Sequence, residues 1–351
     1  MRNRSKSSHV SKSSTSYASK PSAVKTSKSV DTAVKAKGQL HSRSLHQSDY
    51  DFQLLSKVCP QLKQKIVTTP QDKQSIRFSD PLSVKLLNQA LLKAHYSIEY
   101  WDLPAGYLCP PIPGRVDSIH YIADLLADSL SLSQKQLSER KVTGLDIGCG
   151  ANLIYPLLGQ SVYGWHFVAA DIEKKSLAAA NLLIEKNQLQ KKIECRWQDN
   201  PQNIFKGIIQ PGEIFDFSIC NPPFHCSAED AAAGSLRKHT NLQKAKQKRA
   251  GKPRLKETVV NYPSGKQQLN FAGQHNELWC DGGESAFVRR MIEQSKSYAN
   301  QCYWFTSLVA KKENLPAIKK ALAKAEVKQQ KIISMSQGQK ISRMVCWSFI
   351  E

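Results

Sequence analysis

Short hydrophobic runs alternate with amphipathic stretches from residue 142 to the end of the chain. The runs have the length of buried strands and fall at residues 142–147, 166–172, 193–197, 214–220, 303–310, 331–335 and 344–349. Hydrophobic positions at helical spacing lie between them at 176–187, 284–297 and 315–325. This alternation predicts an α/β fold with a mostly parallel, seven-stranded sheet covered on both faces. A turn at 337–339 joins the last two runs and predicts a closing antiparallel hairpin.

The first 140 residues have a different pattern. Residues 1–45 are rich in Ser and Lys and carry almost no large apolar side chains, so we expect a disordered basic tail. In residues 46–140, apolar positions at helical spacing predict a helical extension on the substrate side, with helices at 81–95 and 117–130. The prolines between these helices, at 109–115, are expected to hold the chain extended. The main domain is then residues 141–351, with a basic loop at 235–256.

Charge is concentrated in two segments. Of the formal net charge of +21, residues 1–48 and residues 235–256 each contribute +9. Such clusters are typical of contacts to a polyanion, although a basic tail can also be solubilising charge. For residues 235–256 we favour contact with nucleic acid, because of where this loop lies relative to the candidate site described below.

Composition argues against several protein classes. No apolar run reaches the roughly 18 residues that span a bilayer, so we expect no membrane association. The N-terminus lacks an apolar stretch, and its weak amphipathic pattern makes a transit peptide a minor alternative. Nine cysteines occur without a Cys-x-x-Cys pair, which predicts reduced thiols, no metal site and a cytoplasmic protein. Cys149 and Cys226 lie beside motifs and are interpreted as small packing residues.

A glycine turn follows the first predicted strand, in the pattern Asp146-x-Gly148-x-Gly150. Two glycines let the backbone approach a nucleotide without a Cβ in the way. A Gly-x-Gly alone is weak evidence, and the third glycine of a dinucleotide fingerprint is absent. The second strand ends in Asp171, whose carboxylate can accept both hydroxyls of a ribose; the alternative is a helix N-cap.

Three further residues are candidates for the same cofactor. Asp146 can bridge the turn and the amino group of a bound methionine, or it can be purely structural. Gln198 and Asp199 follow the third strand, where an adenine ring is often contacted in this type of sheet.

The fourth strand ends in Asn221-Pro222-Pro223-Phe224, which we predict to be the catalytic turn. The Asn221 carboxamide oxygen can accept a hydrogen bond from an amino group, and Pro222 fixes the turn without offering an N–H. Phe224 supplies a ring on which a base can stack, worth about 1–3 kcal/mol. An ordinary strand-ending turn is the alternative. With the glycine turn and Asp171, the motif predicts a Rossmann-like class I methyltransferase that uses S-adenosylmethionine and acts on a base amino group.

The basic loop begins shortly after this turn, so it would lie at the mouth of the acceptor pocket. Its cations can neutralise phosphates and release counterions. The candidates for RNA contact are Arg237, Lys238, Lys244, Lys246, Lys248 and Arg249.

Several stretches resemble the bacterial 23S rRNA adenine-N6 methyltransferases, which are related to the eukaryotic U6 small nuclear RNA adenine methyltransferase. The similar stretches are residues 101–104, 111–120, 145–159, 220–225 and 279–288, and the resemblance covers roughly residues 45–351. It implies a catalytic Asn221–Phe224 turn and an rRNA or large-subunit assembly intermediate as substrate. It also implies that Arg115 binds the cofactor, although its position alone suggested a surface or RNA-facing arginine. The element Asp281–Glu284 matches the family without a derivable role.

Three other functions stay open. Glutamine N5-methyltransferases use a related Asn-Pro-Pro-Tyr turn, but Phe224 and the basic charge favour nucleic acid. Adenine methyltransferases that act on DNA usually carry Asp in place of Asn221. A non-catalytic rRNA-binding assembly factor would not need an intact Asp146, Gly148, Asp171 and Asn221.

Overall fold

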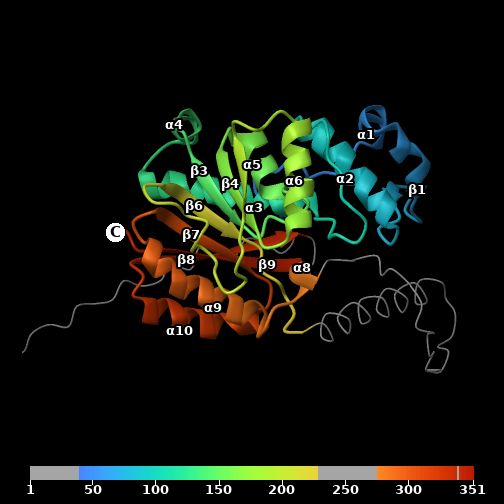
Figure 1. Cartoon of the computed structure of the whole chain (residues 1–351). Helices are drawn as coiled ribbons and strands as arrows, with labels where there is room; N and C mark the ends of the chain where they lie inside the picture. Colours follow the sequence, from blue (N-terminus) through green and yellow to red (C-terminus); the bar gives the residue numbers. More distant parts are fainter. Residues whose placement is uncertain (1–38, 228–274, 338–339) are drawn as a thin grey trace, which may run out of the picture. The chain divides into compact units, whose positions relative to one another are not determined.

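A seven-stranded sheet runs through the centre of the computed structural model, which describes residues 39–227, 275–337 and 340–351 (Figure 1). Along the sheet the strands lie in the order β5-β4-β3-β6-β7-β9-β8. Their bounds are β3 Thr143–Ile147, β4 His166–Asp171, β5 Ile193–Trp197, β6 Phe215–Cys220, β7 Cys302–Val309, β8 Gln329–Gln337 and β9 Lys340–Ser348.

Strands β3 to β7 are parallel, and β9 inserts antiparallel between β7 and β8. The predicted mostly parallel sheet and its closing hairpin are therefore confirmed. The last two strands are longer than their apolar runs, because backbone pairing between β8 and β9 continues to Gln337 and Lys340.

Both faces of the sheet are buried, which explains the continuous apolar runs. Along β3, Leu145 and Ile147 pack on one face with helices α9 and α10. The opposite face packs on a larger cluster made by α2, α3, α5 and α6 (Figure 1). The helix bounds are α2 Pro81–Tyr96, α3 Ile112–Leu130, α5 Ile154–Tyr163, α6 Lys174–Lys186, α9 Gly283–Ser295 and α10 Leu315–Ala325. Short helices α4 Gln134–Glu139 and α8 His275–Leu278 complete this part.

Helix α3 begins inside the proline-rich stretch, so the prediction of extended chain through residue 115 was wrong. The helix starts at Ile112, five residues before the predicted start at 117, and Pro113 sits in its first turn. The first turn has no intrahelical acceptor for its N–H groups, so a proline there costs no hydrogen bond. This earlier start places Arg115 on the helix.

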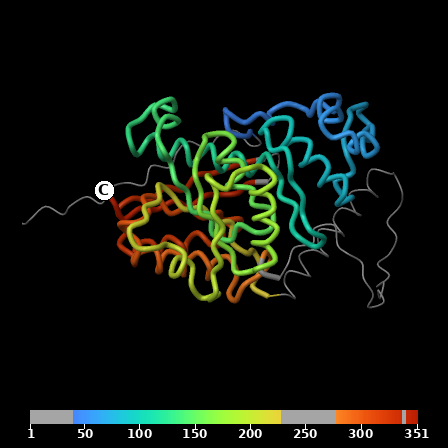
Figure 2. The backbone as a smooth tube through the Cα atoms, turned by 45° about the horizontal axis from the view of Figure 1, so that its top comes forward, coloured from blue at the N-terminus to red at the C-terminus, as the bar shows by residue number. Residues whose placement is uncertain are grey.

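The N-terminal part of the described chain contains α1 Phe52–Val58, the 3-10 helix η1 Pro60–Lys65, and the hairpin β1 Ile66–Thr68 with β2 Gln74–Ile76. These elements lie beside α2, at the opposite end of the molecule from α10 (Figure 2). They share one hydrophobic cluster with the sheet.

Residues 39–45 do not fit the predicted disordered tail, because polar contacts anchor them to α3. The His41 backbone N–H donates to Asp117, and the His41 ring lies 2.8 Å from an Asp124 carboxylate oxygen. Arg43 pairs with the same carboxylate at 2.8 Å and donates to the Tyr163 hydroxyl. Composition could not predict this anchor, since its partners lie some 80 or more residues away.

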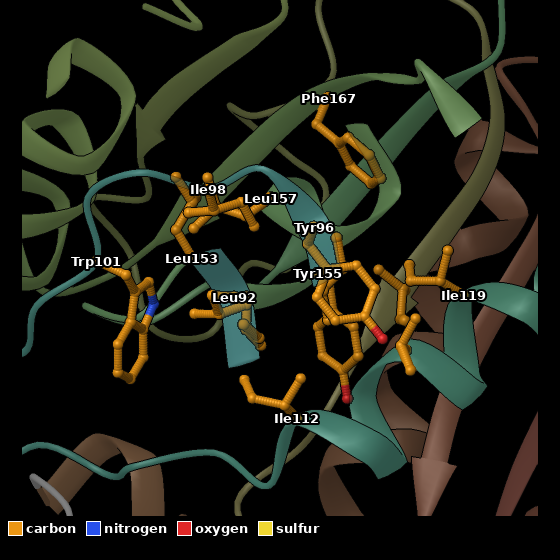
Figure 3. Packing of buried hydrophobic residues seen from close by; sticks show 14 of the residues in the cluster. Leu92, Tyr96, Ile98, Trp101, Ile112, Ile119, Leu153, Tyr155, Leu157 and Phe167 are labelled. Atoms are coloured by element: carbon orange, nitrogen blue, oxygen red, sulfur yellow. The ribbon is translucent and has the colours of Figure 1, made fainter. Parts of the chain in front are cut away.

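Gly144 on β3 packs against two aromatic rings in the hydrophobic cluster to which α2, α3 and α5 contribute. Phe167 and Phe217 pack edge to face there, with ring centroids 5.8 Å apart. Figure 3 shows Phe167 with side chains from α2, α3 and α5 in the same cluster. A Cβ on Gly144 would lie 2.5 Å from the Phe217 ring and 2.6 Å from the Phe167 ring, so no side chain fits.

We expect Gly144→Ala to destabilise the protein by about 1–3 kcal/mol, because the two rings must move in a close-packed core. Thr143→Ala, one residue earlier on the same strand, is the control, since it removes atoms without creating an overlap. Denaturant unfolding of the two variants checks this. Equal unfolding midpoints for Gly144→Ala and the unmodified chain would contradict the packing account.

Candidate active site

The parallel register brings three turns to one edge of the sheet. Ile147, the last residue of β3, pairs with Ala170 of β4 on one side and with Cys220 of β6 on the other. The glycine turn, Asp171 and the Asn221 turn therefore leave the sheet side by side. The strand order reverses between β3 and β6, which is where ligands bind in doubly wound sheets.

A cavity of about 420 Å³ opens at this edge. Its volume is within the usual range for a small-molecule site. Among its lining residues are Arg115, Gly148, Gly150, Tyr155, Asp171, Glu173, Gln198, Asn203, Asn221, Pro223, Glu277 and Trp279.

The glycine turn needs both of its glycines. Gly148 and Gly150 have φ angles of +73° and +62°, a region that other residues enter only with strain. The Gly148 and Cys149 N–H groups both donate to the Ala170 carbonyl oxygen, at 2.8 and 3.0 Å. The turn thus folds back against the end of β4, and its backbone lines the cavity.

Asp171 joins the glycine turn to helix α6. One carboxylate oxygen accepts the Gly150 N–H at 2.8 Å, and the other accepts the Glu173 N–H at 2.8 Å. The N-cap of α6 is Glu173, so Asp171 is not the cap itself. Burial raises the pKa of Asp171, while the backbone N–H donors lower it. The carboxylate lines the cavity with lone pairs left for hydroxyl groups, as the ribose hypothesis requires.

Asp146 is a buried carboxylate on the face of β3 that α3 and α5 cover. Both of its oxygens lack a hydrogen-bond partner among the described residues, and so does Nε of Arg115. Burial, with the nearby Asp171 carboxylate, raises the pKa of Asp146 well above its usual range, and Arg115 opposes the shift. Buried polar atoms normally have partners. An ammonium beside Asp146 and a carboxylate beside Arg115 would supply them, so these residues fit the methionine part of S-adenosylmethionine.

The side chain of Arg115 faces inward, which corrects its interpretation as a surface arginine. Its guanidinium donates to the Tyr155 hydroxyl and lies 5.4 Å from the centre of that ring. Tyr155 comes from α5, forty residues later in the chain, so local sequence could not predict this contact.

The two residues predicted to contact an adenine ring have different positions. Gln198 lines the cavity, but its amide is occupied by the Lys206 carbonyl oxygen and the Asn200 N–H, so it shapes the loop after β5. Asp199 is exposed and lines a separate hollow with residues 200–207, so it does not reach the cavity. Asn203 of the same loop does line the cavity and was not predicted.

The Asn221 turn separates the cavity from a smaller one of about 60 Å³. Asn221 and Arg115 line both cavities. Phe224 lines the smaller cavity, together with Pro111, Asp117, Leu308, Ala310 and Ser336. Asn221 therefore lies at the boundary between the two cavities, where it can contact a ligand in either of them.

The element Asp281–Glu284, for which the sequence suggested no role, supports this turn. Gly283 has a φ of +64°, and a Cβ there would lie 3.3 Å from the backbone of His225 and Cys226. The buried Glu284 carboxylate accepts the Ala310 N–H at 2.6 Å and the Asn314 amide at 2.6 Å. The element thus holds the chain after Phe224 on one side and the end of β7 on the other.

Residues 225 and 279 form a parallel bridge, so the chain segments that flank the undescribed stretch 228–274 lie together at the cavity. The six predicted RNA contacts, Arg237 to Arg249, lie outside the described residues. All nine cysteines lie within the described part and are free thiols.

Among the described residues, no three His, Cys, Asp or Glu side chains are grouped as a metal site would require. In the same residues, no helix has the length and apolarity to cross a membrane.

Comparisons with known proteins agree with the chemistry of the cavity. A family model described as RNA methyltransferase matches residues 34–351. The ribosomal RNA large subunit methyltransferase F of Aeromonas salmonicida (strain A449) is 50% identical over 315 residues, 90% of this chain and 93% of that protein.

Solved structures show the same fold. The hMettl16 catalytic domain in complex with MAT2A 3′UTR hairpin 6 matches with a TM-score of 0.67 and 26% identity, over 89% of this chain and 98% of that one. The N-terminal domain of human METTL16 in complex with SAH matches with a TM-score of 0.67 at 24% identity, over 89% of this chain and 99% of that one.

We expect Asp146→Asn to stabilise the cofactor-free protein increasingly as pH rises. The pKa of Asp146 is raised on folding, so ionising it costs stability above its unfolded value of about 4. The cost grows by about 1.4 kcal/mol per pH unit until the folded pKa is reached. Thermal unfolding at pH 5 and pH 8 checks this, with Asp199→Asn as the exposed control. An Asp146→Asn effect that is the same at both pH values would contradict the buried, unpaired carboxylate.

Proposed function

The chain belongs to the family of RNA methyltransferases whose model it matches, and from this premise we propose that it methylates the N6 amino group of one adenine in 23S rRNA. The observation that carries the proposal is the position of Asn221 on the wall between two cavities. The larger cavity has the size for S-adenosylmethionine, and the smaller one, lined by Phe224, would be the acceptor side.

Charge around the larger cavity suits this cofactor. Among the described residues, four carboxylates line it, those of Asp171, Glu173, Glu277 and Asp281, and Asp146 is buried nearby; the cations are Arg115 and Arg290. S-adenosylmethionine carries a sulfonium and an ammonium against one carboxylate. An excess of negative charge in a site shielded from water favours such a ligand.

Each part of the cofactor has a proposed partner. Arg115 would hold the methionine carboxylate and Asp146 its ammonium, since both side chains have buried atoms without a partner among the described residues. Asp171 would accept the ribose hydroxyls, and the backbone at Gly148 and Gly150 would lie against the nucleoside. When bound, the cofactor supplies an electrophilic methyl group on sulfur.

The protein's own part in the reaction is to position the amine. The Asn221 carboxamide oxygen accepts one N–H of the adenine amino group, which reduces delocalisation into the ring and turns the nitrogen lone pair toward the methyl. Pro222 is buried, and neither it nor Pro223 has a backbone N–H, so the backbone at these two positions can only accept hydrogen bonds. Phe224 stacks on the base and fixes its plane. Near-attack geometry of this kind supplies several kcal/mol, and no strong base is needed before attack.

The identity of the RNA rests on relatives and on charge. The relative from Aeromonas salmonicida is named for large-subunit rRNA, and this chain covers most of its length. We propose 23S rRNA, free or in an assembly intermediate, as the substrate, and the cytoplasm as the place of action. The basic residues 237–249 fall within residues 228–274, and the described segments before and after that range meet in the bridge between His225 and Trp279; Trp279 lines the cavity. The match to RNA methyltransferases favours this substrate over a glutamine side chain.

We expect Asn221→Ala to lower kcat at least about 100-fold, the loss typical of removing one positioned transition-state partner. Its Kd for S-adenosylmethionine should stay within about threefold, since Arg115, Asp146 and Asp171 remain. Asn300→Ala, an exposed asparagine, is the control. Methylation of 23S rRNA transcripts and calorimetric cofactor binding separate the two effects. Full turnover by Asn221→Ala would exclude this asparagine from the reaction.

We expect replacement of Arg237, Lys238, Lys244, Lys246, Lys248 and Arg249 by Gln to weaken RNA binding and flatten its salt dependence. If all six contact phosphates of single-stranded RNA, the slope of log K against log salt should fall by about four. Replacing Lys319, Lys320 and Lys324 on α10 is the control. Filter binding at several salt concentrations gives the slopes, and an unchanged slope would remove these residues from the interface.

A further inference from the structure

Residues 101–111, the later part of the chain between α2 and α3, form a strap along the cofactor cavity. Leu108 and Pro110 of the strap line the cavity. Both ends of the strap are fixed on α2: the Gln89 amide donates to the Trp101 carbonyl oxygen at 2.8 Å, and the buried Asn88 amide donates to that of Pro110 at 2.7 Å. The Trp101 indole, seen in Figure 3, also donates to the Asn152 carbonyl oxygen beyond the glycine turn.

The middle of the strap is held differently, by two carboxylates that line the cavity. The Tyr107 hydroxyl donates to Glu173 at 3.0 Å, and the Leu108 backbone N–H donates to Oε2 of Glu277 at 3.0 Å. The other Glu277 oxygen lies 3.4 Å from the place where a Cβ on Gly150 would stand. One carboxylate thus holds the strap, 169 residues earlier in the sequence, and lies next to the glycine turn.

Glu277 lies close in sequence to the residues that support the catalytic turn. It lies in α8, and the next residues pair with the chain that follows Phe224: the His225 N–H donates to the Leu278 carbonyl oxygen at 3.0 Å, and the Cys280 N–H donates to that of His225 at 3.1 Å. A displacement of α8 therefore moves both the support of the strap and the exit of the catalytic turn.

We propose that Glu277 is a positioning residue that latches the strap over the cofactor cavity and so slows cofactor release. The inference rests on the proposed cofactor site and deepens it. A hydrogen bond from a backbone N–H to a carboxylate is among the stronger ones. Losing it leaves the middle of the strap held by the hydrogen bond from Tyr107 to Glu173 alone, while both ends stay anchored. The latch also couples cofactor retention to the catalytic turn, because α8 contacts both the strap, through Glu277, and the chain after Phe224, through Leu278.

A rival role for the same carboxylate is simple attraction to the positive sulfonium. The two roles differ in how they treat the product, S-adenosylhomocysteine, which has lost that charge. A latch holds cofactor and product equally, whereas charge attraction favours the cofactor alone.

The experiment measures the Kd and dissociation rate of both molecules for the full chain, Glu277→Ala, Glu277→Gln and the exposed control Glu293→Ala. We expect Glu277→Ala to raise both quantities about tenfold or more for S-adenosylmethionine and S-adenosylhomocysteine alike. Glu277→Gln should recover part of the loss, because its amide oxygen still accepts the Leu108 N–H.

Cys109 gives a second readout that needs no cofactor. Burial raises the pKa of this half-buried thiol to about 11, and Asn88 holds its sulfur at 3.2 Å. Opening of the strap should increase its alkylation rate several-fold in Glu277→Ala, measured by peptide mass spectrometry, with buried Cys346 as the internal reference.

Three outcomes would overturn the latch: unchanged release rates in Glu277→Ala, a loss confined to S-adenosylmethionine, or unchanged alkylation of Cys109. Failure of the unmodified chain to bind either molecule would instead overturn the proposed cofactor site, and the latch with it.

Discussion

The parallel pairing of β3 with both β4 and β6 is the constraint on which the site depends. Because Ile147 is opposite Ala170 and Cys220, three turns that are far apart in the sequence leave the sheet at neighbouring points. A shift of one residue in either pairing would turn the side chains of that strand to the opposite face. A shift in the pairing of β3 with β4 would also separate the Gly150 N–H from the Asp171 carboxylate, which it contacts at 2.8 Å. The strand register therefore positions both the cofactor contacts and the amine acceptor.

Features at the same edge of the sheet lower the stability of the ligand-free protein. Asp146 is buried without a partner among the described residues, and the glycine turn holds two residues at positive φ. Each of these features is unfavourable for folding alone, since buried ionised groups need partners. They become favourable when a ligand with an ammonium and a nucleoside fills the cavity. This pattern is expected where a binding site is preformed and lowers the stability of the ligand-free protein.

Much of the architecture could be predicted from the sequence because it depends on local pattern. The seven strands followed from apolar runs, and the glycine turn and the Asn221 turn followed from residue types at strand ends. What could not be predicted depends on distant partners. The inward position of Arg115 needs Tyr155, the anchor at His41 needs Asp124, and the role of Glu284 needs the N–H of Ala310. Asp199 was placed wrongly because the chain turns after Gln198, so that Gln198 and Asn203 line the cavity while the Asp199 side chain is exposed.

We propose that the glycine turn, Asp171 and the Asn221 turn form one site for methylating an adenine amino group in large-subunit rRNA. The most direct test is incubation of the purified chain with tritiated S-adenosylmethionine and total RNA from cells that lack the protein, followed by nucleoside analysis. The account predicts label in N6-methyladenosine from the large rRNA. Label in another nucleoside, in protein, or in no product would contradict it.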